Sequence, residues 1–264
     1  MKKISDRKRI VIKVGTSTLT HRTGMLNIRR VEQLVKTLAD IQNSGHEVIL
    51  VSSGAIGLGM GKLGLRERPK DTPGKQACAA VGQCELMYLY DNLFAEYSIS
   101  VAQMLLTKYV LLEDRRKNVE NAMERLISHR VIPVINENDT VAIDELELEV
   151  GENDSLAAIV ADIAKADLLI IMSDIDGLYD KDPHTYEDAK LIPVVHEITD
   201  EIKALAGGAG TKLGTGGMIT KLNAVEIAYK SDIDVVLMNG QHPKTLYDLF
   251  DGKSAGTIFS KNED

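Results

Sequence analysis

Short apolar runs of strand length alternate with longer segments of helical period along most of this chain. In the longer segments, apolar residues recur at spacings of three and four, as they do on one face of a helix. This alternation predicts an α/β fold with a mostly parallel sheet and helices on both faces, because parallel neighbours need a crossover connection. The expected strands are Arg9–Val14, Glu47–Val51, Ser100–Thr107, Val131–Ile135, Asp167–Met172 and Asp234–Met238.

The helix boundaries follow from capping residues and from the spacing of apolar residues. Asn27 is a good N-cap for a helix that Gly45 ends, since asparagine satisfies free amide groups and glycine stops helices. Further helices are expected at Gln76–Tyr97, at about Asp114–Ser128 and from a start near Thr215. All of them fall between expected strands, where crossover connections belong.

The segment Thr140–Val150 departs from this rhythm because it alternates apolar and acidic residues. That period predicts an exposed antiparallel strand or hairpin, which we expect to pass over the ligand site. The 264 residues contain no linker-like tract, low-complexity stretch or repeat, and the glycine-rich stretches sit at the ends of expected elements. We therefore expect a single domain over residues 1–264.

Composition argues against several classes of partner. The chain has no tryptophan, 4% aromatic residues and a net charge of −8, which disfavours nucleic acid and anionic membranes. Lys13 interrupts an N-terminal apolar run of only strand length, so we expect no secretory signal and no membrane span, and a location in the cytoplasm. Cys78, Cys84 and the six histidines lack metal-ligand spacing, so no metal-ligating residues are assigned.

The residues that follow the expected strands are the first candidates for a site, because open α/β sheets bind ligands beyond the carboxyl ends of their strands. Lys13 is followed by Gly15–Ser17, and the next strands are followed by Ser52–Ala55, Asn136–Asp139 and Ser173–Pro183. Glycine and small hydroxyl residues let backbone amides approach an anion. The first two turns therefore resemble phosphate cradles, although an ordinary turn and a helix cap would also explain them.

The stretch GTGGMITK, Gly214–Lys221, is a sharper signal. Its glycines run into an expected helix, and a lysine one turn into that helix can reach back toward a bound anion. A triphosphate would suit these backbone donors together with Lys13 and Lys221. The chain has no GxxxxGK[ST] loop, and the GxGxxG match at Gly59–Gly64 neither follows a strand nor precedes a helix, so a dinucleotide site is rejected.

Carboxylates at the strand ends are suited to holding magnesium or to orienting lysines. Asp139, Asp154, Asp174 and Asp176 all fall at such places. In VGENDSLAA, Asp154 begins an expected helix, so plain N-capping by the Asn-Asp pair is an alternative to a catalytic role. Asp162 lies inside that helix, where we expect a solvated or structural role.

A larger set of motifs occurs in a fixed order along nearly the whole chain: KVGTSTLT, SSGAIGLG, AVGQ, QMLLT, PVINENDTVA, VGENDSLAA, SDIDGLYDKDP and GTGGMITK. In this set the chain resembles the glutamate 5-kinases, a family within the amino acid kinase superfamily. NEND, GEND and GTGGMxTK are specific to that family, whereas the lysine-glycine start and DGLY are shared with carbamate, acetylglutamate, aspartate and uridylate kinases. The resemblance implies a three-layer αβα sandwich that transfers phosphate from ATP, with Mg²⁺, to the γ-carboxylate of L-glutamate in the first step of proline biosynthesis.

The resemblance also implies roles for individual residues. Lys13 and Lys221 would flank the transferred phosphoryl group, and Asp154 would hold the two lysines in place. Such chemistry needs charge stabilisation and no general base, because a carboxylate acceptor is already ionised. The implied ATP contacts are Lys13, Gly15, Ser173, Asp174, Thr215, Gly216, Gly217, Met218, Ile219, Thr220 and Lys221. The implied acceptor contacts are Ser53, Gly54, Asp139 and Asn153.

Further expectations come from the resemblance alone. L-proline is the expected feedback inhibitor, a homodimer or homotetramer is the expected assembly, and the chain resembles the short form without a C-terminal PUA domain. Ser173 stands where threonine is common, which keeps the hydroxyl. Two alternatives stay open: a sibling kinase with another acceptor, such as N-acetylglutamate or a nucleoside monophosphate, and a catalytically idle nucleotide-binding regulator. A regulator would be expected to have lost Lys13, Asp154 or Lys221.

Overall fold

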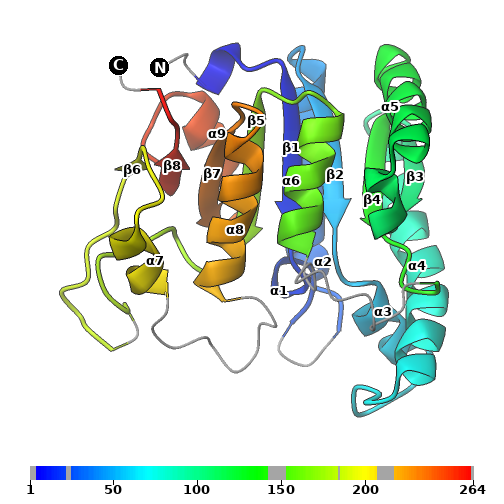
Figure 1. Ribbon diagram of the computed structural model, residues 1–264. Coiled ribbons are helices and arrows are strands. Elements are labelled where there is room, and N and C mark those ends of the chain that lie inside the picture. Colours follow the sequence, from blue (N-terminus) through cyan, green and yellow to red (C-terminus); the bar gives the residue numbers. More distant parts are fainter. Residues whose placement is uncertain (1–3, 22–24, 142–152, 184, 207–216, 263–264) are drawn as a thin grey trace.

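The computed structural model describes residues 4–21, 25–141, 153–183, 185–206 and 217–262. Eight strands of this part of the chain form one sheet in the order β3-β4-β2-β1-β5-β7-β8-β6 (Figure 1). Neighbouring strands pair in parallel, except that β7 and β8 are antiparallel. The strands are β1 Arg9–Val14, β2 Glu47–Ser52, β3 Val101–Leu106, β4 Ile132–Glu137, β5 Leu168–Ser173, β6 Val194–Val195, β7 Asp234–Asn239 and β8 Thr257–Phe259.

Helices cover both faces of this sheet (Figure 1). The helices α5, α6 and α8 pack on one face, and α2, α4 and α9 pack on the other. The helices are α1 Thr16–Leu19, α2 Ile28–Asn43, α3 Ala55–Lys62, α4 Thr72–Ala95, α5 Glu113–Ser128, α6 Asn153–Ile163, α7 Asp200–Ala206, α8 Met218–Tyr229 and α9 Thr245–Phe250, with short 3₁₀ turns at Ile4–Asp6 and Lys108–Leu111. The predicted three-layer αβα sandwich is therefore confirmed.

Strand β1 shows how the sequence sets the two layers, because successive side chains of a strand point to opposite faces. Ile10, Ile12 and Val14 belong to the core beneath α2 and α4. Val11 belongs to the other core, beneath α6 and α8. Lys13 shares the face of Val11, so its side chain is directed toward α6 and α8.

All six predicted strands are present, with ends shifted by a residue or two. The sequence interpretation missed β6 and β8, which have two and three residues and are too short to show a period. Helix α4 begins at Thr72 rather than Gln76, because the Asp71 side chain accepts the amide of Gly74 and caps the helix. The helix expected near Thr215 begins at Met218 within the described residues.

The glycine-rich helix α3, which the sequence interpretation also missed, packs unusually close to α4. A Cβ at Gly59 would lie 1.8 Å from the carbonyl oxygen of Cys78, and one at Gly82 would lie 1.7 Å from that of Ala55. Only glycine permits this approach of two backbones. The glycines of Gly59–Gly64 thus lie within α3 and at its end, where Gly59 serves helix packing, which agrees with the rejection of a dinucleotide site.

Several smaller expectations can be compared with this fold. Asp162 forms an ion pair with Arg116 at 2.8 Å and accepts a hydrogen bond from Ser231, so its role is structural. Cys78 and Cys84 are both free thiols. No helix in the described ranges is long and apolar enough to cross a membrane. Residues 142–150 of the expected exposed hairpin lie outside the described residues.

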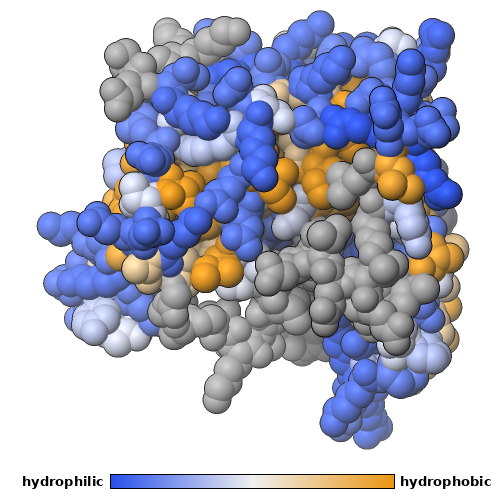
Figure 2. Space-filling model, viewed as in Figure 1, coloured by the Kyte–Doolittle hydropathy of each residue, from blue (hydrophilic) through white to orange (hydrophobic). Residues whose placement is uncertain are grey.

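Hydrophilic side chains crowd the upper edge of the molecule in Figure 2, near the starts of the strands of the parallel sheet. They also cover the projecting end of α3 and α4 at the lower right of the view. That end carries the charged connection between the two helices, which includes Arg66, Glu67, Arg68 and Lys70.

Candidate active site

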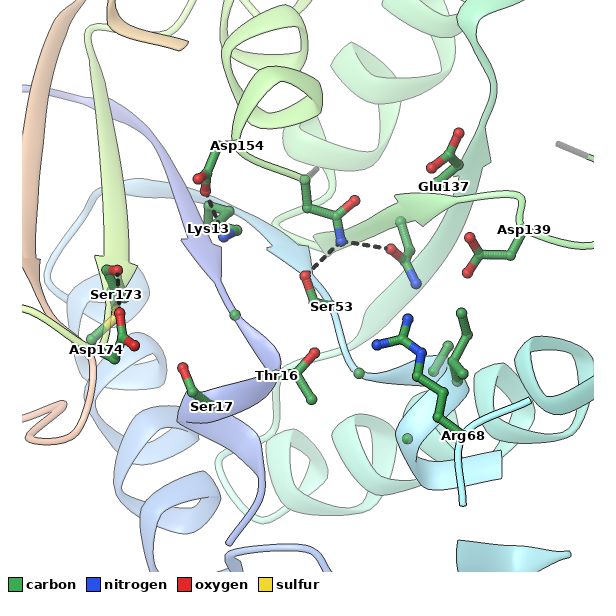
Figure 3. Close-up of a pocket in the computed structure, with 18 of the residues that line it drawn as sticks. Lys13, Thr16, Ser17, Ser53, Arg68, Glu137, Asp139, Asp154, Ser173 and Asp174 are labelled. Carbon is green, nitrogen blue, oxygen red and sulfur yellow. Dashed lines mark hydrogen bonds and ion pairs between the residues drawn. The ribbon is translucent and has the colours of Figure 1, made fainter. Parts of the chain in front are cut away.

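A cavity of about 350 Å³ opens where β1, β2, β4 and β5 end (Figure 3). These four strands are parallel to one another, so their carboxyl ends lie at one edge of the sheet. Ligands bind at this edge in open α/β sheets. The residues that follow four separate strands are thereby brought into one wall.

Asp154 and two lysines form the centre of this wall. Lys13 comes from β1, Asp154 is the second residue of α6, and Lys221 lies in the first turn of α8. Lys13 Nζ lies 2.5 Å from Asp154 Oδ1, and Lys221 Nζ lies 3.2 Å from Asp154 Oδ2. One carboxylate thus holds two ammonium groups that are far apart in the sequence.

Burial makes this arrangement electrostatically strong. Asp154 has no exposed surface, and Lys13 and Lys221 are 8% and 6% exposed. Burial by itself would raise the pKa of Asp154, but the positive charges of Lys13 and Lys221 outweigh it and hold that pKa below its ordinary value. The carboxylate is therefore ionised at neutral pH, and two cations face one anion.

The helix ends add to the positive potential of the wall. Helices α6 and α8 both begin at the cavity, with Asp154 and Lys221 in their first turns. The amino end of a helix carries a partial positive charge, so both dipoles act in the same sense as the two ammonium groups. The wall can therefore stabilise an anion that enters the cavity.

Small residues after β1 and β5 line the cavity on one side of this centre. Gly15 precedes the short helix α1, and a Cβ there would still be 3.7 Å from Lys13 Nζ. Ser173 ends β5 and donates its hydroxyl to Asp174 Oδ1 at 3.1 Å. This side offers space, hydroxyl groups and one carboxylate in the same cavity as the two lysines. Figure 3 shows Ser173 and Asp174 there, with Thr16 and Ser17 after β1.

A chain of amide and hydroxyl groups lines the other side. Asn153 Nδ2 donates to Ser53 Oγ at 2.7 Å and to Asn136 Oδ1 at 3.0 Å (Figure 3). Asn136 Nδ2 in turn donates to Gln83 Oε1 at 3.0 Å. These bonds hold Asn153, the first residue of α6, toward the cavity. Glu137 and Asp139 follow in the same wall.

The sequence and the fold of this chain both resemble those of known kinases. The Amino acid kinase family profile matches residues 8–239. The glutamate 5-kinase of Clostridium perfringens is 52% identical over 98% of this chain and 97% of its own length. This chain belongs to the glutamate 5-kinase branch of the amino acid kinase family. Membership in this family implies ATP as the nucleotide.

Two further relatives differ in what they share with this member of the family. The glutamate 5-kinase of Caldanaerobacter subterraneus is 52% identical over 95% of this chain, which covers 67% of the relative's length. Carbamate kinase from Giardia lamblia bound to AMP-PNP superposes with a TM-score of 0.68 at 18% identity, over 98% of this chain and 100% of that chain. At that identity the likeness shows the fold alone.

The structure brings most of the predicted site residues into the cavity wall. Those that line it are Lys13, Gly15, Ser53, Gly54, Asp139, Asn153, Asp154, Ser173, Asp174 and Lys221. Gly217, Met218, Ile219 and Thr220 lie in the adjoining first turn of α8 and its cap and do not line the cavity in the described part of the chain. Thr215 and Gly216 lie outside the described residues.

Two of the turns for which alternatives were open both cap a helix and line the cavity. Gly54 caps α3 with a φ of 107°, so the helix-cap interpretation holds for SSGA, and Ser53 and Gly54 nevertheless line the cavity. Gly15 likewise caps α1 while lining the cavity. Asp176 does not line the cavity, and its carboxylate accepts hydrogen bonds from Asn239 and Tyr179.

Sequence reasoning missed some lining residues, chiefly Arg68, Glu137, Ile56 and Met60. Arg68 lies in the connection between α3 and α4, which has no strand or helical period to suggest a site. Its place directly before Pro69 was the available signal, because a residue before proline is held in an extended conformation. Glu137 belongs to the NEND motif, but the resemblance assigns only Asp139 of that motif to the acceptor.

The described residues hold no group of three or more histidine, cysteine, aspartate or glutamate side chains that could bind a metal ion. Mg²⁺ is commonly held by one or two carboxylates together with substrate phosphates, and not by an all-protein cage. Asp174, which lines the same cavity as the two lysines, is suited to that limited role. The residues present therefore fit a magnesium ion that enters with a nucleotide.

Proposed function

We propose that this chain transfers the γ-phosphoryl group of ATP to the γ-carboxylate of L-glutamate, giving ADP and L-glutamyl 5-phosphate. This reaction would be the first step of proline biosynthesis. The observation that carries the proposal is the pair of buried lysines that share Asp154 at the edge of the cavity. The 52% identity to a curated glutamate 5-kinase supports the choice of acceptor.

The proposed reaction needs little covalent assistance. A γ-carboxylate oxygen attacks the γ-phosphorus, an O–P bond forms, and the bond to the bridging oxygen breaks so that ADP leaves with its electron pair. A carboxylate is ionised at neutral pH, so no general base is required. No histidine is among the residues that line the described cavity, which is in keeping with this chemistry.

Lys13 and Lys221 would stabilise the negative charge on the transferring phosphoryl group. Asp154 holds both ammonium groups at the edge of the cavity, where an entering phosphoryl group can contact them. Asp154 is a positioning residue in this scheme, since it acts on the phosphoryl group only through the lysines. Preorganised charges of this kind are effective because they need no reorientation when the reaction occurs.

The nucleotide would lie on the side of Gly15, Ser173 and Asp174, with the stretch Thr215–Lys221 at its phosphates. Asp174 would hold Mg²⁺, which supplies charge neutralisation at the phosphate oxygens when it is bound. The acceptor would lie on the opposite side and contact Ser53, Gly54, Asp139 and Asn153. The hydrogen-bond chain through Asn153 supports that placement.

We extend the proposal to context. L-proline is proposed to inhibit by competing with L-glutamate, and the active assembly is proposed to be a homodimer or homotetramer. The free thiols Cys78 and Cys84 suit the reducing cytoplasm, where we place the enzyme. We treat residues 1–264 as one catalytic domain because a single sheet includes strands from Arg9 to Phe259.

A hydroxamate assay tests the reaction. The protein is incubated with ATP, Mg²⁺ and hydroxylamine, and L-glutamate, L-aspartate or N-acetylglutamate is offered as acceptor. Trapped acyl phosphate with L-glutamate alone is the expected result. Product only with N-acetylglutamate would reveal a sibling kinase. No product with any of the three acceptors would contradict the proposal and would leave a nucleoside monophosphate kinase or an idle nucleotide-binding protein. Relief of L-proline inhibition by added L-glutamate tests the competition.

A further inference from the structure

Arg68 reaches the cavity from the connection between α3 and α4 (Figure 3). We propose that its guanidinium binds the α-carboxylate of the acceptor and thereby selects a free amino acid over acceptors that lack this group. The inference rests on the proposed function, because it assigns a residue to the acceptor of that reaction. Arg68 is then a specificity-determining residue.

The segment around Arg68 is held by local structure. Pro69 restricts Arg68 to an extended backbone and packs against the first turn of α4. The fit is close, because a Cβ on Gly74 would lie only 2.7 Å from Pro69 Cβ. Asp71 then caps α4 by accepting the amide of Gly74 at 2.9 Å. These contacts fix the point from which the Arg68 side chain extends into the cavity.

The charges around the cavity match the three charged groups of a free α-amino acid with a second carboxylate. Lys13 and Lys221 mark the place where the reacting carboxylate must meet the phosphoryl group. The α-ammonium and the α-carboxylate must then lie away from the lysines. Glu137 and Asp139 offer negative charge there, and Arg68 faces that same part of the cavity (Figure 3).

Arginine is chemically suited to this task. A guanidinium binds a carboxylate through two parallel hydrogen bonds, which gives both strength and orientation. Within the described parts of the chain, the side chain of Arg68 has no hydrogen bond or ion pair of its own. Its donors therefore remain for a ligand. In Figure 3 it lies near the Asp139 side of the cavity and apart from Ser173 and Asp174, which disfavours a contact with the nucleotide.

The test compares Arg68→Gln with Arg66→Gln. Both variants remove one positive charge from the same exposed connection, but Arg66 does not line the cavity. Loss of a charge-assisted pair should raise the KM for L-glutamate about 10- to 100-fold in Arg68→Gln. The KM for ATP should stay within about twofold of wild type. Arg66→Gln should leave both constants unchanged.

A second acceptor separates binding of the α-carboxylate from a general loss of affinity. 4-Aminobutyrate is L-glutamate without that carboxylate, and its inhibition constant against L-glutamate can be measured whether or not it is phosphorylated. The constant should be the same in wild type and in Arg68→Gln, so the preference for L-glutamate should fall by the full 10- to 100-fold. Arg68→Lys should restore only part of the preference, since an ammonium lacks the fork of donors.

Three results would overturn the inference: a KM for L-glutamate within twofold of wild type in Arg68→Gln, an equal rise in the KM for ATP, or an equal loss of affinity for 4-aminobutyrate. Each of these requires a wild-type enzyme that phosphorylates L-glutamate. If the wild type forms no hydroxamate with L-glutamate, the proposed function itself fails. The two failures are therefore distinguishable.

Discussion

Strand β1 carries a cation near each end on the same face of the sheet, Arg9 at its start and Lys13 near its finish. Val11 lies between them in the core beneath α6. Helix α6 runs across both, because Asp154 at its start contacts Lys13 and the carbonyl of Ala164 just beyond its end accepts from Arg9. The two ends therefore share a strand, a face and a covering helix.

The end with Arg9 is closed by partners of its own. Its guanidinium donates to Glu47 Oε2 and Glu124 Oε2, both at 2.8 Å, and to the Ala164 carbonyl at 2.7 Å. The carboxyl end of a helix carries a partial negative charge, so the dipole of α6 adds to this compensation. Lys8 supplies a second cation to Glu47 at 3.2 Å. Asp167 adds a further carboxylate, which accepts the backbone amides of Lys8 and Arg9. Such a cluster ties elements together through partners of its own.

The end with Lys13 gathers positive charge at the cavity. Two buried lysines share one carboxylate, and the amino ends of α6 and α8 add positive potential. This end borders the cavity, whereas Arg9 does not line it. The comparison teaches that the charged groups of a structural cluster face one another, while the lysines held by Asp154 face a cavity that a ligand can enter.

The largest expected effect comes from removing one cation at the cavity. Loss of a preorganised charge typically lowers kcat by about 10²- to 10³-fold, or about 2.7 to 4 kcal/mol, so Lys221→Ala should fall in or beyond that range with a smaller change in the KM for ATP. Lys221→Arg should recover little, since a planar fork does not replace a compact ammonium. Steady-state kinetics measure both.

Lys230 provides the control, because it is an exposed lysine at the end of the same helix. Lys230→Ala should keep its kcat. A kcat within a few-fold of wild type in folded Lys221→Ala would show that the lysines at the cavity are structural, as Arg9 is.

The next effect tests whether the two lysines act as one unit through Asp154. The double variant Lys13→Ala/Lys221→Ala should lose much less kcat than the product of the two single losses, with a coupling of about 0.5 to 3 kcal/mol. Rates of hydroxamate formation for the four proteins complete the cycle. Losses that multiply would mean that the lysines act independently despite their shared partner.

A smaller effect, on stability alone, is expected at the end of β1 that carries Arg9. Arg9→Met keeps the apolar stem but removes hydrogen bonds to charged groups, so the free energy of unfolding should fall by about 1.5 to 3 kcal/mol. The kcat of the folded enzyme should not change. Urea denaturation measures the loss. The matched control is Arg125→Met at an exposed position on α5, which should change the free energy of unfolding by no more than about 0.5 kcal/mol. A large drop in kcat would contradict the assignment of Arg9 to structure.

The smallest effect is the pH dependence of the Asp154 interaction near neutral pH. Because the pKa of Asp154 is held below its ordinary value of 3.8, its stabilising contribution is complete above that value and is lost as pH falls through the lower folded pKa. The difference in free energy of unfolding between wild type and Asp154→Asn should therefore be constant from about pH 8 to pH 5 and shrink below pH 3.8. A difference that grows with acid would refute the ionised assignment.

Much of the site could be anticipated from the sequence because chemically distinctive residues follow apolar runs. Lys13, Ser53 and Ser173 each lie in or just after an expected strand, and a parallel sheet brings such positions to one edge. Arg68 could not be placed in this way, because it follows helix α3, which the sequence pattern did not predict. The glycines that suggest a loop in α3 instead let that helix meet α4, which is a contact between two elements.

The sequence by itself determined the alternation of strands and helices and the face of β1 on which Lys13 lies, because both depend on local period. Only the tertiary structure decided that Asp154 meets both Lys13 and Lys221, and that Asn153 meets Ser53 and Asn136. It also decided the strand order and the antiparallel pairing of β8 with β7. All of these features depend on contacts between segments that are far apart in the chain. The energies of such contacts come from burial and from charges brought close together, and a local sequence pattern contains neither.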